Sequence, residues 1–362
     1  MNADPRILIL LEPASTQSIV APDLLARLER LAHVTAIKAP HALLPSQLAS
    51  LLGSHDIAIT GWGTPCLPAE IAADPNSRLR YICNMTGSIR AIIPPNYLKG
   101  STVITNWGNT MSPFVAEAAL TMILACCRRI KYHGMILDRR LKSNAPPGQK
   151  QSLVRRLKNC IKDRVHQEWQ QAGEVPGFTL FEASVGFYGL GHTAKELARL
   201  LSPFDVKLRY FDPYAVNDTP YSMEKVADLK ELFRTCEVVS IHAGPTAETE
   251  NTVNWTVLDC LPREAILINT ARGRIINERD LLAALEEKKL WVGLDVFAKE
   301  PMPRRSPLRR HPRVVATPHT AGLVGDKLAQ LLSNLVIENV SSFISEKNLK
   351  FVVTQELYNR MT

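Results

Sequence analysis

Residues 184–194 read SVGFYGLGHTA, a strand pattern that leads into a glycine turn and a helix. A β-branched and aromatic run, residues 184–188, enters a turn at Gly189, and an amphipathic helical pattern follows. Gly189 permits a tight turn, Gly191 lets the backbone approach a ligand, and Ala194 is small enough for close helix–strand packing. The free amides and the dipole at the start of the helix favour an anion. The stretch therefore predicts a strand–turn–helix unit that binds a pyrophosphate.

A second strand pattern extends this prediction to a dinucleotide. Residues 207–211 lead into Asp212, 18 residues after Ala194. A carboxylate at about this spacing binds the ribose hydroxyls of a dinucleotide. An isolated glycine pattern also occurs in ordinary strand-to-helix turns, but the flanking strands favour the dinucleotide. Because Asp212 is followed by Pro213 and not by an arginine, and a carboxylate repels a 2′-phosphate, the sequence favours NAD over NADP.

Apolar runs and helical patterns alternate along most of the chain, which predicts βαβ units and parallel sheets. Because 362 residues are too many for one core, we expect two α/β domains. A long helix is expected to begin at Ser112, as N-cap, and to continue through the apolar residues 115–130. The expected strands are residues 7–11, 57–60, 81–83, 103–105, 184–188, 207–211, 238–242, 265–269, 292–296 and 314–317, and the other helices residues 22–32, 193–201, 223–234 and 278–288.

The composition is 46% hydrophobic and 22% charged, which is typical of a soluble globular protein. No apolar stretch is long enough to span a bilayer, and the N-terminal residues lack the pattern of a secretory signal. Seven cysteines, none spaced as CxxC, indicate reduced packing thiols of a cytoplasmic protein. For the adjacent Cys126 and Cys127, a redox role is the alternative to packing in the core.

The net charge of +8 comes from one segment. Residues 128–168 contain twelve basic and three acidic residues, and they overlap an interruption of the alternating pattern that predicts a basic insertion at about 139–176. A solvated insertion is the favoured interpretation of such a charge run. An acidic partner, nucleic acid or a neighbouring subunit remain alternatives, although without a recognition motif nucleic acid is not an expected partner.

Charged residues follow three further strand patterns downstream of the glycine turn. Arg272 ends the stretch INTAR, Asp295 and Glu300 lie in GLDVFAKEP, and His319 lies in TPHTAG. Each residue alone has an ordinary structural interpretation, as a salt bridge, a turn residue or a satisfied histidine. Because the carboxyl ends of parallel strands face the ligand crevice, their shared position predicts a catalytic group.

These motifs together resemble the D-isomer-specific 2-hydroxyacid dehydrogenase family, which includes phosphoglycerate, glyoxylate/hydroxypyruvate and D-lactate dehydrogenases. The similarity is dense over residues 115–322 and looser over residues 7–106. It implies an α/β fold of two Rossmann-like or flavodoxin-like parallel-sheet domains with an interdomain cleft. Residues 1–107 and 325–362 would form the substrate (catalytic) domain, and residues 108–324 the NAD-binding Rossmann domain.

The resemblance also implies an activity and its residues. Arg272 is similar to the arginine that binds the carboxylate and carbonyl of a 2-oxo acid, a role that suits a planar guanidinium. His319 resembles the general acid/base, and Glu300 the carboxylate that orients the histidine ring and favours its charged form. The implied reaction interconverts a 2-oxo acid and a D-2-hydroxy acid with NAD(H). It needs no metal, and the histidine spacing predicts no metal site.

Further family positions are expected to contact the cofactor, with Asp295 beside the nicotinamide carboxamide. They are Gly189, Gly191, His192, Ala194, Asp212, His242, Thr270 and Asp295. The family also implies a homodimer, clasped by an arm that corresponds to the basic insertion. No membrane partner is expected.

The substrate loop departs from the family pattern. Gly87 keeps one of two usual glycines, but Met85 stands near the other, with Thr86 between them. The pocket is therefore expected to be remodelled, and the nearby Trp62 and Trp107 either line an apolar pocket or pack in the core. This departure and the basic segment leave an alternative, a dinucleotide-sensing regulator of the corepressor kind with weak turnover.

Overall fold

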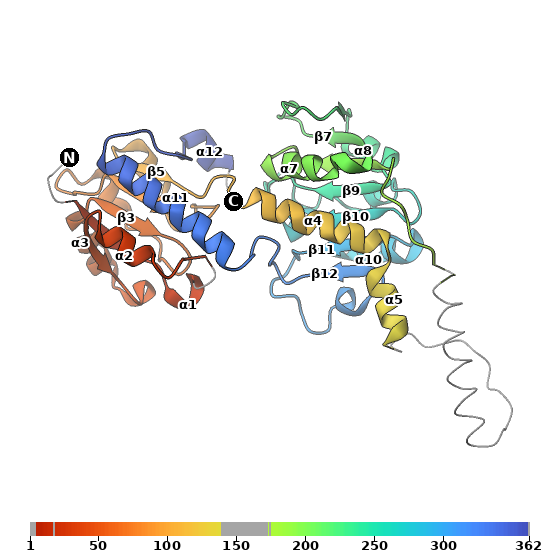
Figure 1. Ribbon diagram of the computed structural model, residues 1–362, viewed down its shortest axis with the longest axis horizontal. Coiled ribbons are helices and arrows are strands. Elements are labelled where there is room, and N and C mark those ends of the chain that lie inside the picture. The colour runs from red at the N-terminus through yellow and green to blue at the C-terminus, as the bar shows by residue number, and fades with distance from the viewer. Residues whose placement is uncertain (1–4, 17–18, 139–172, 174, 361–362) are drawn as a thin grey trace, which may run out of the picture. The chain divides into compact units, whose positions relative to one another are not determined.

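The computed structural model describes residues 5–16, 19–138, 173 and 175–360, and it divides the chain into two compact units. Unit 1 comprises Met1–Phe114 and Gly322–Thr362, and unit 2 comprises Val115–Ala321. Each unit contains its own parallel sheet, which confirms the prediction of two parallel-sheet α/β domains (Figure 1). The predicted insertion at 139–176 lies almost entirely outside the described residues.

The sheet of unit 1 has five parallel strands in the order β2-β1-β3-β4-β5. The chain adds β2 on one side of β1 and the later strands on the other, so the strand order reverses between β1 and β3. Ligands of open α/β sheets bind outside the carboxyl ends of the strands at such a reversal. The strands are β1 (Arg6–Ile9), β2 (His33–Ala36), β3 (Ile57–Thr60), β4 (Tyr81–Asn84) and β5 (Val103–Thr105).

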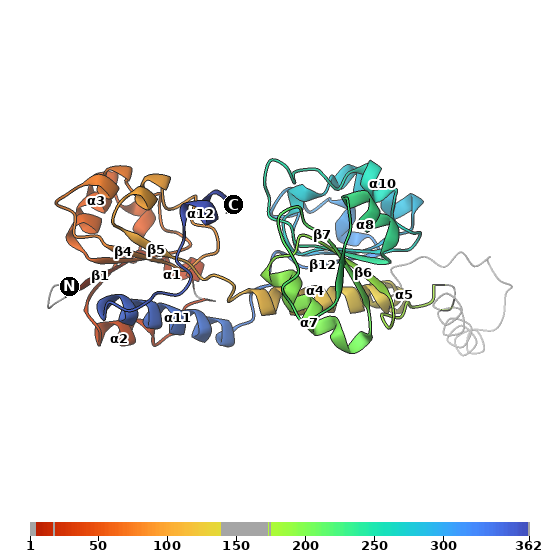
Figure 2. The ribbon, with the colours of Figure 1, turned by 90° about the horizontal axis from the view of Figure 1, so that it is seen from above.

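Helices cover both faces of this sheet, α2 and α11 on one face and α3 on the other (Figure 2). Leu24 and Leu28 of α2 pack with Leu328 of α11, while Leu48 and Leu52 of α3 pack in the opposite core. Because both faces are covered, the central strands are buried along their whole length, as parallel strands usually are. The helices are α1 (Pro13–Thr16), α2 (Leu24–Glu29), α3 (Pro45–Ser54), α11 (Asp326–Ile344) and α12 (Gln355–Arg360).

The sheet of unit 2 has seven parallel strands in the order β12-β11-β10-β9-β6-β7-β8. The strand order reverses between β6 and β9, so the residues after these two strands define the ligand end of the sheet. The strands are β6 (Ser184–Tyr188), β7 (Lys207–Phe211), β8 (Met223–Lys225), β9 (Val238–Ile241), β10 (Ile266–Asn269), β11 (Trp291–Leu294) and β12 (Val314–Ala316).

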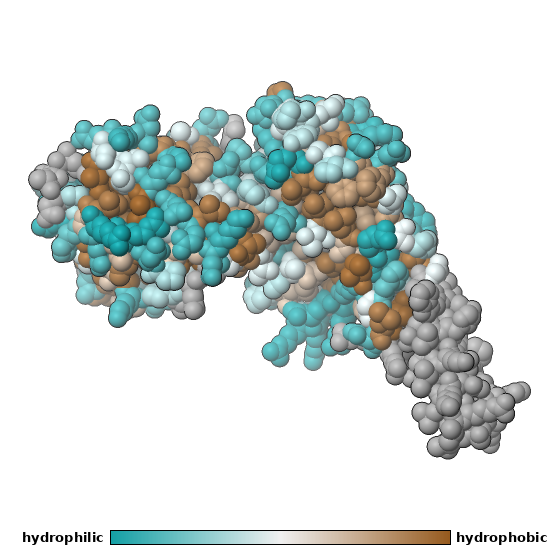
Figure 3. All heavy atoms as spheres, in the orientation of Figure 1, coloured by the Kyte–Doolittle hydropathy of each residue, from teal (hydrophilic) through white to brown (hydrophobic). Residues whose placement is uncertain are grey.

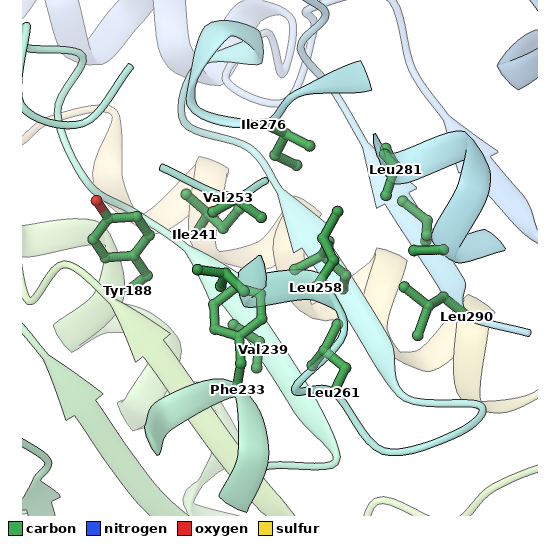
Figure 4. Close-up of a cluster of buried hydrophobic side chains, with 14 of the residues drawn as sticks. Tyr188, Phe233, Val239, Ile241, Val253, Leu258, Leu261, Ile276, Leu281 and Leu290 are labelled. Atoms are coloured by element: carbon green, nitrogen blue, oxygen red, sulfur yellow. The ribbon is translucent and has the colours of Figure 1, made fainter. Parts of the chain in front are cut away.

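Two hydrophobic cores hold the helices of unit 2 to the sheet. One core packs α4 and α7 on one face, and the other packs α8, α9 and α10 on the opposite face. Figure 4 shows the second core, where Phe233 of α8 and Leu258 of α9 meet Val239 of β9. The helices are α4 (Ser112–Cys127), which begins in unit 1, α5 (Ile130–Leu137), α7 (His192–Leu201), α8 (Leu229–Thr235), α9 (Trp255–Leu258) and α10 (Glu278–Glu287).

Two helix predictions need correction. The expected helix at 223–234 is wrong in its first part, because Met223–Lys225 forms the edge strand β8. α8 begins only after Asp228, whose carboxylate accepts a hydrogen bond from the Glu231 amide at 2.8 Å. The long helix includes Ser112 and stops at Cys127, because Arg129 has a left-handed backbone with φ of 54° before α5 begins.

The six cysteines in the described part of the chain are free. Burial raises the pKa of Cys126 to about 12 and that of Cys127 to about 11. Both are therefore neutral thiols at neutral pH, which favours packing over redox chemistry for this adjacent pair. Within the described residues, no helix has both the length and the apolar character to cross a membrane.

Candidate active site

The three candidate catalytic residues follow three neighbouring strands. Arg272 comes after β10, Glu300 after β11 and His319 after β12, and these strands pair directly with one another. Since all strands of the sheet are parallel, the three residues lie at the same end of the sheet, where the strands have their carboxyl ends.

His319 and Glu300 form a hydrogen-bonded pair. His319 Nδ1 lies 2.7 Å from Glu300 Oε2, and the second carboxylate oxygen, Oε1, accepts a hydrogen bond from the Phe297 amide at 2.9 Å. Both side chains keep partial exposure to solvent. The carboxylate thus fixes the ring through Nδ1 and leaves Nε2 as the atom that can exchange a proton with a ligand.

Asp295 holds the loop that carries His319. Its carboxylate is almost fully buried and accepts hydrogen bonds from Thr317 Oγ1 at 2.6 Å, the Thr320 amide at 2.8 Å and the Ala321 amide at 3.0 Å. The Asp295 carbonyl also accepts from the His319 amide at 2.8 Å, where His319 has φ of 57°. Asp295 therefore positions the histidine, and its expected contact with a nicotinamide stays a prediction.

The turn that carries Arg272 is built by a residue that the sequence analysis did not single out. The buried side chain of Asn269 donates to the Arg272 carbonyl at 2.9 Å and accepts from the Ala271 amide at 3.0 Å. Arg272 itself is exposed, and its Nη1 donates to the Ala271 carbonyl at 2.8 Å. The surrounding protein lowers the pKa of Arg272 by desolvation, and the negative charge of Glu300 acts in the opposite direction. A polar side chain that ends a buried apolar strand was the signal for Asn269.

The loops after β10 and β11 touch closely at Gly273. A Cβ atom on Gly273 would lie 1.9 Å from the carbonyl carbon of Phe297 and 2.4 Å from the amide nitrogen of Ala298. Only glycine fits between these backbones, so Gly273 sets how near Arg272 comes to the Glu300 loop.

The glycine turn has the geometry of a pyrophosphate cradle. Gly189 has φ of +91°, and a Cβ there would lie 2.6 Å from the Ala243 amide nitrogen. A Cβ on Gly191 would meet nothing within 4 Å, so the space beside the start of α7 is open. His192 is the exposed first residue of α7, and Ala194 is buried against the sheet.

Asp212 is fixed directly after β7. One oxygen, Oδ2, accepts from the Leu190 amide of the glycine turn at 2.8 Å. The other, Oδ1, accepts from the amides of Tyr214 and Ala215, both at 2.9 Å. The structure thus brings this carboxylate to the glycine turn, as the spacing predicts.

Two buried polar atoms directly after β9 and β10 have no partner within the described residues. They are Nε2 of His242, after β9, and Oγ1 of Thr270, after β10. Burial lowers the pKa of His242 to about 3, so the ring is neutral at neutral pH. Buried polar groups are normally hydrogen-bonded. Together with the cradle and Asp212, these orphaned atoms fit a dinucleotide cofactor.

The substrate-loop residues in unit 1 use their side chains for packing. Met85 is buried in the core, and Thr86 Oγ1 accepts from Asn84 Nδ2 at 2.6 Å and donates to the Ser88 carbonyl at 2.7 Å. A Cβ on Gly87 would lie 2.7 Å from Trp107 Nε1. Met85 and Thr86 are therefore covered by the protein, and among these three residues Gly87 alone is partly exposed.

The tryptophans beside this loop contact one another. The rings of Trp62 and Trp107 meet edge to face, with centroids 5.9 Å apart, and Trp62 keeps 37% of its surface exposed. Trp107 thus packs against the loop, while Trp62 retains surface that a ligand can reach.

A pocket of about 570 Å³ adjoins the histidine–glutamate pair. Its lining is mostly apolar and includes both members of the pair and one arginine. The lining residues are Phe297, Glu300, Pro301, Met302, Arg309, Ala316, Thr317, Pro318 and His319. No group of three or more potential metal ligands occurs among the described residues.

In unit 2, the glycine turn and the hydrogen-bonded pair of His319 and Glu300 both lie at the carboxyl ends of the parallel strands. Residues 149–321 match the family model described as "D-isomer specific 2-hydroxyacid dehydrogenase, NAD binding domain". Residues 149–321 are therefore similar to the NAD-binding domain of the D-isomer-specific 2-hydroxyacid dehydrogenase family, in agreement with the resemblance seen in the sequence.

Known proteins of this kind are similar to the chain. A 2-ketogluconate reductase of Gluconobacter oxydans is 31% identical over 183 residues, which cover 50% of this chain and 58% of that protein. A glyoxylate reductase of Thermofilum pendens is 28% identical over 304 residues, 81% of this chain and 80% of that protein. The matched part spans about half the length of several curated relatives.

The whole fold has a counterpart among solved structures. Apo D-mandelate dehydrogenase of Rhodotorula graminis superposes with a TM-score of 0.78 at 20% identity and covers 96% of this chain and 97% of its own. At this identity the match shows the fold alone. The two relatives found by sequence are reductases by name, so they do not favour the regulatory alternative.

Proposed function

We propose that the protein is an NAD-dependent oxidoreductase that interconverts a 2-oxo acid and a D-2-hydroxy acid. The observation that carries the proposal is the hydrogen bond of 2.7 Å between His319 Nδ1 and Glu300 Oε2. This pair, Arg272 and the glycine turn all lie at the carboxyl ends of the strands of one sheet. A 2-oxo acid needs a cation for its carboxylate and a proton for the alkoxide that forms at C2.

The chain's own residues supply these functions. In the direction of reduction, His319 donates a proton from Nε2 to the developing alkoxide, while Nδ1 stays bonded to Glu300. The carboxylate of Glu300 holds the ring in the orientation that this transfer needs. Arg272 binds the substrate carboxylate and polarises the carbonyl. The bound cofactor would supply the hydride, which is chemistry that amino-acid side chains lack.

The residues that would hold the cofactor surround the strand reversal. Gly189, Gly191 and the start of α7 at His192 would receive the pyrophosphate, and Ala194 allows the helix to pack closely. Asp212 would accept the ribose hydroxyls and repel a 2′-phosphate, so we propose NAD rather than NADP. Further contacts would come from His242, Thr270 and Asp295.

Unit 1 would contribute the substrate loop. We propose that the substrate domain is formed by residues 1–107 and 325–362 and that the backbone at Met85, Thr86 and Gly87 meets the substrate carboxylate. A homodimer in the cytoplasm, with the 139–176 segment as its arm, completes the proposal; sedimentation velocity of the full chain and of a variant without residues 142–166 tests the dimer.

Oxidation of NADH in the presence of a panel of 2-oxo acids tests the activity. The panel contains glyoxylate, hydroxypyruvate, pyruvate and phenylpyruvate, and D-2-hydroxy acids with NAD test the reverse direction. Arg272→Ala is expected to lower kcat/KM by at least about a hundredfold, because a charged, bidentate contact to the substrate is lost. Arg274→Ala, two residues further on and exposed, is the matched control. Folded protein that binds NADH but reduces none of these acids would overturn the proposal.

A further inference from the structure

The loop after β11 carries an unusual concentration of positive charge. Residues 301–313 contain five arginines and no acidic residue. Four of these arginines are exposed and have no acidic partner within the described residues: Arg304, Arg305, Arg309 and Arg310. Figure 1 shows this loop projecting from the sheet in blue, and Figure 3 shows a hydrophilic projection at the same place.

The loop is nevertheless firmly anchored. Leu308 is buried in the core of unit 2, and Arg309 Nη2 donates to the Met302 carbonyl at 2.9 Å. Lys131 Nζ donates to the carbonyls of Arg309 and Val314, at 3.3 and 2.5 Å, which adds a further cation beneath the loop. Like charges held together in this way repel one another, and a bound anion would relieve the repulsion.

Only Arg309 of these four arginines lines the 570 Å³ pocket. This volume lies within the range of small-molecule sites, about 300–1,000 Å³. Phe297, Met302 and Pro318 give the lining its apolar character, so the pocket suits an apolar chain with one charged end.

The pocket shares its lining with the catalytic pair. Glu300 directs its carboxylate oxygens to the Phe297 amide and to His319, so both oxygens already have hydrogen-bond partners within the protein. A molecule that occupies the pocket therefore contacts His319 at one place and Arg309 at another.

Resting on the proposed function, we propose that this pocket is the subsite for the distal part of the substrate. It selects 2-oxo acids whose carbon chain is apolar and ends in a second anionic group, and Arg309 binds that group. The preferred substrates would be 2-oxo dicarboxylates rather than glyoxylate or pyruvate.

The test compares acids of equal length. We would measure kcat/KM for 2-oxoadipate and 2-oxohexanoate, which differ only in the terminal carboxylate, and take their ratio. The wild type is expected to favour 2-oxoadipate. Arg309→Gln should lower the ratio by about tenfold or more, the effect of losing a charge-assisted hydrogen bond, and Arg309→Lys should restore part of it.

Two further variants separate charge from shape. Arg310→Gln removes the neighbouring exposed charge outside the pocket lining and should leave the ratio unchanged. Ala316→Leu narrows the pocket without a change of charge, so it should lower kcat/KM for both six-carbon acids equally. The subsite would be overturned if the Arg309 and Arg310 variants changed the ratio of kcat/KM values equally, or if Arg309→Gln left the ratio unchanged.

A binding measurement distinguishes the two proposals. Isothermal titration with adipate and hexanoate needs no turnover. If no 2-oxo acid is reduced but adipate binds in an Arg309-dependent manner, the proposed function fails and the anion subsite stands. If short 2-oxo acids are reduced and adipate binds no better than hexanoate, the function stands and the subsite fails.

Discussion

A single buried carboxylate, Asp295, organises the loop that carries the acid/base residue. Three donors converge on it, the Thr317 hydroxyl and the amides of Thr320 and Ala321. The motif that contains Asp295 is recognisable in the sequence, but its partners lie more than 20 residues away. The sequence therefore suggested a contact with the cofactor, whereas the contacts observed are with the protein itself.

Asp295→Asn tests this role. An amide has one oxygen that accepts and an NH2 group that donates, so at least one of the three donors loses its acceptor. We expect the free energy of unfolding to fall by about 2 kcal/mol and kcat to fall more than KM rises, because the histidine is displaced. Urea unfolding and steady-state kinetics measure the two effects.

Asp259→Asn is the matched control. This exposed aspartate pairs with Lys288 at 3.1 Å on the surface of the same unit, and such pairs contribute little. A loss of stability in the Asp259 variant as large as that in the Asp295 variant would contradict the positioning role.

Among the elements, the loops after β10 and β11 depend on one glycine. Gly273→Ala would place a methyl group inside the backbone of Phe297, so the loop with Arg272 must separate from the loop with Glu300. Overpacking of this kind costs about 1–3 kcal/mol, and we expect a lower melting temperature and a higher KM.

Gly134 in α5 provides the opposite case. A Cβ on Gly134 meets nothing within 4 Å, and alanine favours a helix over glycine by about 1 kcal/mol. Gly134→Ala is therefore expected to leave KM unchanged and to raise the melting temperature slightly. If both glycine variants shift KM alike, the close approach of the loops is not what positions Arg272.

The accuracy of the sequence predictions follows the burial of each element. The strands at 57–60 and 184–188 were predicted with their observed bounds, because buried parallel strands have largely apolar sequences. The strand at 207–211 was also predicted with its observed bounds, although its burial alternates along the chain. The edge strands β2 and β8 are partly exposed and polar, and both were missed. The apolar residues around β8 have a helical spacing, so the sequence predicted a helix there. A short pattern does not distinguish the helical period of about 3.6 residues from the strand period of 2.

Local sequence patterns also predict only part of the candidate site. Motifs located Arg272, Glu300 and His319 after strands, but only the order β12-β11-β10 makes those strands neighbours. Asn269 acts within its own turn, where a polar residue at the end of a buried strand is a local signal. The Arg309 pocket depends on contacts between loops, which no local pattern encodes.

At the scale of the whole molecule, His242 links stability to pH. Burial lowers its pKa to about 3 in the folded protein, whereas the unfolded chain has a value near 6.5. The unfolded state therefore binds a proton first as the pH falls, and the folded state loses stability below about pH 6.5. Between pH 7.5 and pH 5 this group alone is expected to lower the free energy of unfolding by about 2 kcal/mol.

His242→Gln removes this titration. Urea unfolding at pH 7.5 and pH 5 should show a pH-dependent loss that is about 2 kcal/mol smaller in this variant than in the wild type. His33→Gln, on the exposed edge strand β2, should retain the wild-type loss. An unchanged pH dependence in the His242 variant would mean that the ring is not held neutral by burial, and the argument that its Nε2 awaits a cofactor would lose its support.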